Sequence, residues 1–260
     1  MAKAASAPAA SPVRIGVVGH GVVGSAFTAL VARQADTIAA RTGVALSVSR
    51  IAVRDASKHP NMIGDAKIVT DPLEVATAND VDLVVEVMGG TTVAGEVVRA
   101  ALESGKPVVT ANKALLAARS AELFKIADER GIDLLFEAAV CGGIPLIRPL
   151  RESLRGEPIR RVLGIVNGTT NYILTKMAEE SMTYGDALAG AQNLGYAEAD
   201  PSFDIDGVDA AHKLSILASI AFGTRPAFAD VAATGVRHVI AADIAEAAAL
   251  GYKVRLVGVA

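Results

Sequence analysis

Tryptophan is absent from this 260-residue sequence, aromatic residues make up only 4% of it, and there is a single cysteine. One cysteine excludes an internal disulfide and a multi-cysteine metal site, and the cytoplasm is the expected compartment. No apolar run approaches the roughly 20 residues that a membrane helix needs. The formal net charge of −3 comes from mixed acids and bases. Without a basic stripe, we expect a soluble protein with neither a nucleic-acid nor a membrane partner.

The sequence is instead rich in aliphatic residues, because apolar side chains make up 52% of it and charged ones 20%. Ala, Val and Leu in such proportions are typical of helices packed on a parallel sheet. The length allows one large domain or two modest ones. Residues 1–12 are rich in Ala, Ser and Pro and lack the apolar core of a secretory signal, so a flexible tail is expected there.

Residues 13–148 alternate between buried-strand and helix patterns. The expected strands are Val13–Gly19, Val48–Val53, Lys67–Thr70, Val81–Met88, Pro107–Thr110 and Ile132–Ala138. The expected helices are Val22 to about Ala40, Val93–Ser104 and Ala114–Arg130. Strands separated by helices of this length form parallel βαβ units. The first domain is therefore predicted to be α/β, a Rossmann-type doubly wound parallel sheet.

Residues 149–260 have a different pattern, which predicts a second, α+β domain that binds substrate. The expected elements are a strand at Ile159–Val166, helices at about Thr170–Glu180, Tyr184–Leu194 and Val208–Phe222, and a last strand at Val254–Ala260. An acidic loop, Gly195–Asp206, separates the last two helices. Because the sequence stops inside an expected strand, we expect this domain to be truncated at its C-terminus.

A glycine motif, G-x-G-x-x-G, joins the first expected strand to the first helix. Gly19 suits a tight turn, Gly21 lets the backbone approach a pyrophosphate, and Gly24 allows close helix packing. The helix start at Val22 and Val23 would offer N–H groups to the phosphates. The alternative is a structural glycine turn without a ligand, but the strand–turn–helix context favours dinucleotide binding.

The end of the second expected strand bears on the choice of cofactor. Asp55 would bond the ribose 2′-hydroxyl of NAD, whereas Arg54, with Lys58 close behind, would pair with the 2′-phosphate of NADP. We favour NADP over NAD because Arg54 leaves the strand first. A solvated arginine at a strand end is the alternative.

An acid and a lysine in the second domain have the spacing of a proton-donating pair. Asp209 and Lys213 lie four residues apart, so on a helix they share a face. A lysine held by a carboxylate can donate a proton to a developing alkoxide. An ordinary surface ion pair is the alternative. The acidic loop next to this helix, and the need of a nucleotide domain for a proton donor, favour catalysis.

Four further segments resemble the homoserine dehydrogenase family in content and order. They are TANKALLA (Thr110–Ala117), EAAVCGGIPLI (Glu137–Ile147), GIVNGTTNYIL (Gly164–Leu174) and LGYAEADPSFDIDGVDAAHKLSILA (Leu194–Ala218). The resemblance implies an NAD(P)-dependent oxidoreductase that interconverts L-homoserine and L-aspartate 4-semialdehyde, in threonine and methionine biosynthesis. It also implies a homodimer whose second domain mediates dimerisation, and relatives that continue past the equivalent of Ala260.

The resemblance assigns a role to individual residues. Lys213 corresponds to the proton donor, with Asp209 orienting it, and Lys113 to a second active-site lysine near the nicotinamide. Glu198 corresponds to the carboxylate that receives the substrate ammonium, flanked by Asp204 and Tyr196. The cofactor-binding residues include Thr110 and Lys113, and a monovalent cation such as sodium is expected at Glu137 and the backbone oxygens of Val140, Gly142 and Ile144.

Two other functions compete with this interpretation. A semialdehyde dehydrogenase with a cysteine nucleophile would use Cys141 and His212. Cys141, however, lies in a Gly-Gly turn that matches the cation loop, and lone cysteines are usually structural. A truncated, non-catalytic nucleotide-binding remnant is the other alternative, and a homoserine assay distinguishes it.

Overall fold

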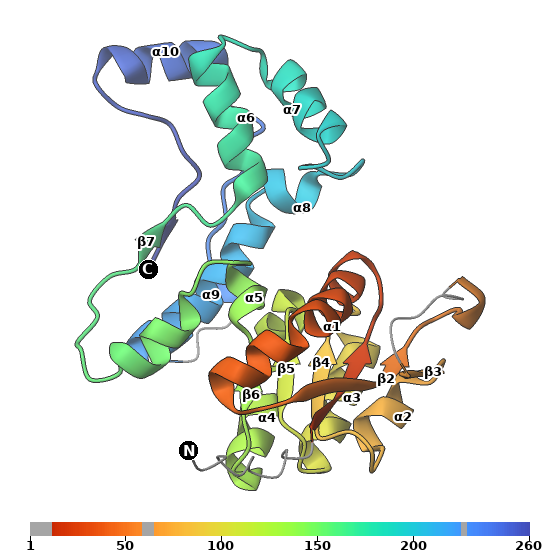
Figure 1. Cartoon of the computed structure of the whole chain (residues 1–260). Helices are drawn as coiled ribbons and strands as arrows, with labels where there is room; N and C mark the ends of the chain where they lie inside the picture. Colours follow the sequence, from red (N-terminus) through yellow and green to blue (C-terminus); the bar gives the residue numbers. More distant parts are fainter. Residues whose placement is uncertain (1–11, 59–64, 225–227) are drawn as a thin grey trace, which may run out of the picture. The chain divides into compact units, whose positions relative to one another are not determined.

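The computed structural model describes residues 12–58, 65–224 and 228–260. The predicted flexible tail, residues 1–12, lies outside this part of the chain except for its last residue. Contacts between residues divide the chain into two compact units, one ending at Ala139 and the other beginning at Val140 (Figure 1). The sequence pattern placed the domain boundary between residues 148 and 149.

The first unit is built on a six-stranded sheet in the order β3-β2-β1-β4-β5-β6. Its strands are β1 (Val13–Val18), β2 (Leu46–Ala52), β3 (Lys67–Val69), β4 (Leu83–Glu86), β5 (Val108–Thr110) and β6 (Leu134–Leu135). Every pairing is parallel. This arrangement confirms the predicted doubly wound α/β fold. The strand order reverses between β1 and β4, so the ligand crevice of such a fold lies at their carboxyl ends.

In the described parts of the connections lie the helices α1 (Val22–Thr42), α2 (Pro72–Thr77), α3 (Thr92–Glu103) and α4 (Lys113–Arg130), and a short 3-10 turn (Ala56–Lys58) follows β2. Helix α3 packs against both α2 and α4. The sheet contributes a buried aliphatic cluster that includes Ile15, Val17, Ile51 and Val85. Among the described helices, none combines the length and the apolar character needed to cross a membrane.

Two elements of the first unit differ from the expectation. The strand predicted over Ile132–Ala138 is reduced to Leu134–Leu135, and a helical turn, α5 (Glu137–Val140), follows it. Leu134 and Phe136 are buried, so the strand ends because the chain turns into α5 and not for lack of burial. Helix α2 was not predicted because it is short. Asp71 caps it by accepting from the Leu73 N–H at 2.9 Å, and a proline occupies its first position.

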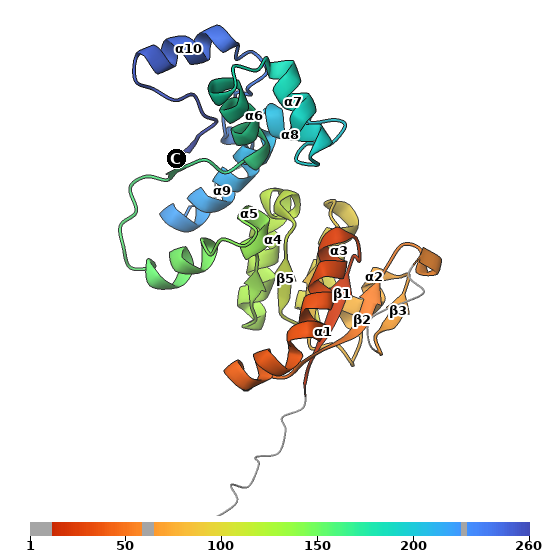
Figure 2. The same ribbon diagram turned by 45° about the horizontal axis from the view of Figure 1, so that its top comes forward.

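The second unit is mostly helical (Figure 2). Its helices are α6 (Gly168–Glu179), α7 (Tyr184–Asn193), α8 (Ser202–Ile205), α9 (Val208–Phe222) and α10 (Ala241–Ala249), with shorter helical turns at Pro149–Ser153 and Phe228–Asp230. Helices α6 and α7 lie side by side in both ribbon views. Its buried core includes Ile173, Leu174, Met177, Ile205 and Ile244.

The two strands expected in the second unit are much shorter than predicted. Only β7 (Leu163–Gly164) and β8 (Gly258–Val259) form, and they pair antiparallel with Leu163 opposite Val259. Leu163 is 61% exposed and Val259 50% exposed. A two-stranded ladder with such exposed side chains has little hydrophobic stabilisation. The α+β prediction is thus correct in type, but the predicted Ile159–Val166 and Val254–Ala260 strands are too long.

A charged contact joins the start of β1 to the loop before β4. The Arg14 guanidinium donates to the Asp82 carboxylate at 2.7 and 2.9 Å, and the Arg14 backbone N–H donates to it at 2.8 Å. The side-chain and backbone hydrogen bonds from Arg14 lower the pKa of Asp82 to about 2. Because both side chains are about 40% exposed, solvent screens much of this interaction.

We predict that Asp82→Asn lowers the free energy of unfolding at pH 7 by less than about 1 kcal/mol. A depressed pKa stabilises the folded state above the unfolded pKa of about 3.9, and this contribution is lost as the pH falls toward 2. The variant should therefore show a shallower loss of stability between pH 4 and 2 in urea unfolding. Asp36→Asn, on the exposed side of α1, is the matched control. An unchanged acid slope would contradict the prediction.

Candidate functional site

The glycine motif adopts the geometry that a dinucleotide fingerprint requires. Gly19 has a φ of +96°, and a Cβ there would come within 2.7 Å of the Met88 backbone. A Cβ on Gly24 would lie 2.1 Å from the Gly19 carbonyl oxygen. At Gly21, by contrast, a Cβ would meet nothing within 4 Å. Packing therefore explains the outer two glycines, whereas the open space at Gly21 fits the approach of a pyrophosphate.

The first turn of α1 presents its backbone to that open space. Gly21 is the N-cap and has no side chain with which to cap the N–H groups. Val22 and Val23 follow it and are 88% and 57% exposed, although both are apolar. Exposed valines at an uncapped helix start leave the N–H groups accessible to phosphate oxygens. The chain's own residues thus fit a dinucleotide here.

The residues that bear on cofactor choice lie just beyond β2. Arg54 is exposed, as expected of a group that meets a 2′-phosphate. The Asp55 carboxylate accepts from the Ser57 N–H at 3.1 Å and from its hydroxyl at 2.6 Å, and lies 3.7 Å from the Lys58 ammonium. Asp55 therefore shapes the turn that follows β2.

A buried carboxylate organises the carboxyl ends of β4 and β5, and the sequence analysis missed it. Glu86 is fully buried, and its Oε1 accepts from the Met88 and Gly89 N–H groups at 2.9 and 3.2 Å. Its Oε2 accepts from the Thr110 hydroxyl at 2.6 Å. The signal for it was a single acid within an otherwise apolar strand, which is rare unless the group is well bonded. Thr110, predicted to bind cofactor, is thereby fixed at the crevice.

The network continues from Thr110 to the start of α4. The Thr110 Oγ accepts from the Asn112 N–H at 3.0 Å. Asn112 caps α4 by accepting from the Leu115 N–H at 3.0 Å, and its Nδ2 donates to the Gly90 carbonyl at 2.7 Å. Lys113 is the first residue of this helix. Its backbone position is thus set by the loop after β4 as well as by β5.

We predict that Glu86→Ala lowers the free energy of unfolding by about 3 kcal/mol, because buried donors lose their acceptor. Glu86→Gln should cost less than about 1 kcal/mol, since its oxygen can still accept from the backbone and its amide can donate to Thr110. Urea unfolding of both variants measures the difference. Equal losses would show that the bonds to Glu86 are not what stabilises this edge.

In the second unit, α9 brings the predicted catalytic pair together. The Lys213 ammonium lies 2.9 Å from the Asp209 Oδ2, and these side chains are 17% and 3% exposed. Lys213 also donates to the Val166 carbonyl oxygen at 2.8 Å. The pair is therefore not the solvated surface pair that was its alternative. A lysine has three N–H donors, so two bonds within the protein leave one for a substrate oxygen.

Asn167 links this pair to Asp204 on α8. The Asn167 Nδ2 donates to the Asp204 Oδ1 at 2.8 Å and to the Asp209 Oδ2 at 2.9 Å. The Thr169 hydroxyl lies 3.0 Å from the Asp204 Oδ2 and 2.8 Å from the Tyr196 carbonyl oxygen. Asp204, which was predicted to flank the substrate site, thus joins the predicted Asp209–Lys213 pair in one hydrogen-bonded cluster, and the backbone of Tyr196 adjoins it. The sequence analysis contained Asn167 only within the segment Gly164–Leu174 and gave it no role of its own.

The other predicted substrate residues lie in the exposed loop beside this cluster. The Tyr196 side chain is 58% exposed and packs edge-on against Tyr172, with ring centroids 5.3 Å apart. Glu198 is exposed, and its carbonyl oxygen accepts from the Gln192 side chain at 3.0 Å. This hydrogen bond positions the backbone of Glu198, and the role of its side chain in binding substrate stays a prediction.

The predicted cation loop begins in a helical turn. Glu137 starts α5, the buried Val140 ends it, and Gly142 and Ile144 follow in an exposed turn. Cys141, the rival nucleophile, is a half-buried free thiol in that turn. The His212 ring, its supposed partner, packs against the rings of Phe228 and Phe203, with centroids 4.1 and 5.4 Å away. These aromatic contacts give His212 a packing role.

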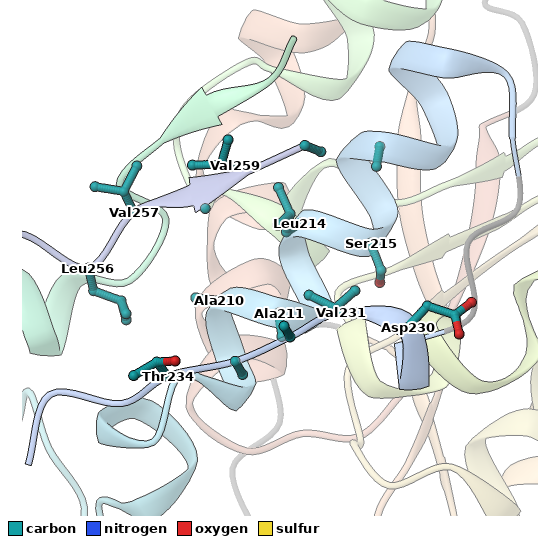
Figure 3. Close-up of a pocket in the computed structure, with 16 residues that line it drawn as sticks. Ala210, Ala211, Leu214, Ser215, Asp230, Val231, Thr234, Leu256, Val257 and Val259 are labelled. Carbon is teal, nitrogen blue, oxygen red and sulfur yellow. The ribbon is translucent and has the colours of Figure 1, made fainter.

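A pocket of about 470 Å³ lies beside α9 (Figure 3). Its lining includes Ala210, Leu214, Val231 and Val259, which are apolar. A helix turns about once every 3.6 residues, so the pocket-lining positions of α9 face away from Asp209 and Lys213. The residues predicted to act on substrate therefore lie outside this pocket.

The chain is similar to homoserine dehydrogenases along nearly its whole length. The model of the homoserine dehydrogenase NAD-binding domain matches residues 19–137, and that of the homoserine dehydrogenase domain matches residues 145–260. Homoserine dehydrogenase of Pseudomonas aeruginosa is 47% identical over 252 residues, which cover 96% of this chain and 57% of that protein. The chain thus spans little more than half the length of this curated relative.

Solved structures agree with these matches. A homoserine dehydrogenase from Thiobacillus denitrificans superposes with a TM-score of 0.91 at 42% identity, covering 96% of this chain and 58% of that one. A hyperthermophilic archaeal homoserine dehydrogenase in complex with NADPH gives a TM-score of 0.76 at 33% identity, covering 88% of this chain and 75% of that one. The agreement extends over both units.

Proposed function

Because the chain belongs to the homoserine dehydrogenase family, we propose that it interconverts L-homoserine and L-aspartate 4-semialdehyde by hydride transfer. The observation that carries this proposal is the buried Asp209–Lys213 pair, bonded to Asn167 and through it to Asp204. When bound, NAD(P) supplies the hydride donor or acceptor. The chain's own residues bind and orient the substrate and move the proton.

In the reducing direction, Lys213 is the proton donor to the aldehyde oxygen. Its ammonium is held by Asp209 and by the Val166 carbonyl, so its remaining N–H has a restricted direction. A fixed donor that protonates a developing alkoxide both stabilises its charge and completes the alcohol. In the oxidising direction, the neutral amine takes the hydroxyl proton as the hydride leaves the carbon.

The remaining substrate contacts follow the family resemblance. Glu198 receives the substrate ammonium, and Asp204 and Tyr196 border the same site. Lys113 is the second active-site lysine, and its place at the head of α4 supports this role because it lies at the carboxyl end of β5. Binding residues commonly lie on loops that a rigid scaffold fixes, as the loop holding Glu198 does.

The proposal includes NADP as the preferred cofactor and a monovalent cation such as sodium at Glu137 and the oxygens of Val140, Gly142 and Ile144. The exposure of Arg54, beside an Asp55 engaged in its own turn, supports NADP. Backbone oxygens with one carboxylate suit a hard cation. We place the activity in the cytoplasm, which a free Cys141 fits, in threonine and methionine biosynthesis, and assign it to a homodimer.

We predict that the chain reduces NADP in the presence of homoserine, and that Lys213→Ala lowers kcat on the order of 10²–10⁴-fold, the usual effect of losing one general acid. Its dissociation constant for NADP should hardly change, because the glycine motif lies in the other unit. Nicotinamide absorbance and fluorescence measure the two effects. Lys176→Ala is the matched control, since Lys176 also pairs with an acid four residues along, Glu180, but on the exposed side of α6. Near-normal turnover of the Lys213 variant would refute the assignment, and an inactive wild type would favour the non-catalytic alternative.

Cofactor preference gives a separate prediction for Arg54→Ala. A charge-assisted bond is worth roughly 1.5–3 kcal/mol, which corresponds to a loss of about 10- to 150-fold in NADP affinity. NAD has no 2′-phosphate, so its affinity should change little. Titration of both cofactors checks this, with Arg41→Ala in the last turn of α1 as the control. Equal weakening of NAD and NADP would assign Arg54 to supporting the end of β2.

A further inference from the structure

We propose that Asn167 is a positioning residue, whose side-chain amide bridges the carboxylates of Asp204 and Asp209 and thereby sets the direction of the Lys213 ammonium. This inference rests on the proposed function for its effect on turnover. The hydrogen bonds of the amide are observed in the structure and do not depend on the proposed function. Asn167 is 4% exposed and lies at the junction between the loop after β7 and α6.

Every hydrogen-bonding position of this amide has a partner. Its two N–H groups donate hydrogen bonds to the Asp204 Oδ1 and the Asp209 Oδ2, at 2.8 and 2.9 Å. Its Oδ1 accepts from the Thr170 N–H and from the Thr170 hydroxyl, both at 2.8 Å. Turning the amide over would point its oxygen at two carboxylates and its N–H groups at the Thr170 donor. The network therefore fixes one orientation.

The shared oxygen connects the amide to the proton donor. The Asp209 Oδ2 that accepts from Asn167 also pairs with the Lys213 ammonium. The residue just before Asn167 contributes the second acceptor for that ammonium, the Val166 carbonyl oxygen. One turn of backbone thus holds Lys213 directly through Val166 and indirectly through Asn167 and Asp209. A displacement of this turn would move both acceptors together.

The charges explain why a neutral bridge is required. The ionisable groups joined around the amide are Asp204 on α8 and Asp209 and Lys213 on α9; on α6, it contacts Thr170, which is neutral. Two acids face one base in a largely buried site, so the acids repel each other. An amide that donates to both carboxylates opposes this repulsion without adding a charge. A residue without these donors would leave the repulsion unopposed.

The experiment separates this role from helix capping, which Asn167 also performs. Asn167→Ser keeps a good N-cap but cannot bridge the two carboxylates, and Asn167→Asp keeps the cap and nearly the same shape while replacing both donors with a third acid. We expect both folded variants to lose about 100-fold in kcat/KM for homoserine, the order of effect of a misplaced catalytic group. Their NADP affinity should stay within about twofold of the wild-type value.

The pH profile gives the readout that a capping role would not change. Without the amide N–H that donates to its Oδ2, the Asp209 carboxylate protonates more readily, so the acid limb of kcat/KM should move to higher pH in Asn167→Ser. Thr183→Ala is the matched control, because Thr183 caps α7 in the same unit and accepts from the Asp186 N–H at 3.2 Å. It should lower the urea midpoint without moving the acid limb. A folded Asn167→Ser variant with kcat/KM within threefold of wild type and an unmoved acid limb would overturn the proposal.

A readout without turnover distinguishes failure of this inference from failure of the proposed function. Carboxyl ¹³C resonances of Asp204 and Asp209 can be followed against pH in the full chain, with and without Asn167→Ser. We expect Asp209, which loses a donor to its Oδ2, to titrate at higher pH in the variant. If the wild type does not oxidise homoserine but the titration shifts in the variant, the bridging role of Asn167 is supported and the proposed activity is refuted. Superimposable titrations would refute the bridge whatever the activity.

Discussion

Each candidate site depends on the hydrogen bonds of an asparagine side chain at the start of a helix. Asn112 caps α4 and donates from its amide to Gly90, and Asn167 caps α6 and donates to two acids. In each case the oxygen satisfies an N–H of the helix while the nitrogen fixes a second segment. Aspartate or serine could cap equally well but would supply no such donors. The amide therefore couples the local start of a helix to a distant part of the chain.

This coupling explains which features of the sites could be predicted from the sequence. The spacing of Asp209 and Lys213 is local, so a helical pattern was enough to pair them. Glycine positions after a buried strand are likewise local signals, and the geometry at Gly19 and Gly24 agrees with them. The bonds from Asn167 cross 37 and 42 residues of sequence, and only tertiary packing brings these groups together. No local pattern marks such a pair.

The fold shows the same division between local and non-local causes. Alternating buried strands and helices predicted the doubly wound sheet, since each βαβ unit is nearly self-contained. The strands expected in the second unit were wrong in length because a strand extends only as far as its partner pairs and buries it. Leu163 and Val259 remain largely exposed, and beyond them Val162 and Ala260 exchange backbone hydrogen bonds at 2.9 and 3.0 Å. Helix α2 was not predicted, because it is only six residues long. Asp71 and Pro72 nevertheless form the capping signal of a helix start.

In each unit, a buried acid marks the candidate site. Among the described residues, the acidic side chains classed as buried are Glu86 and Asp209. Burying a carboxylate is costly, and replacing a buried ion pair by apolar residues is often neutral or stabilising by about 1–4 kcal/mol. Stability alone therefore does not account for the buried Asp209–Lys213 pair. Glu86 fixes the carboxyl edge of β4, where a doubly wound fold binds its ligand, and Asp209 holds the proposed proton donor. Both acids lie among several hydrogen-bond donors, which is the arrangement expected where a site must hold polar groups in fixed directions away from water.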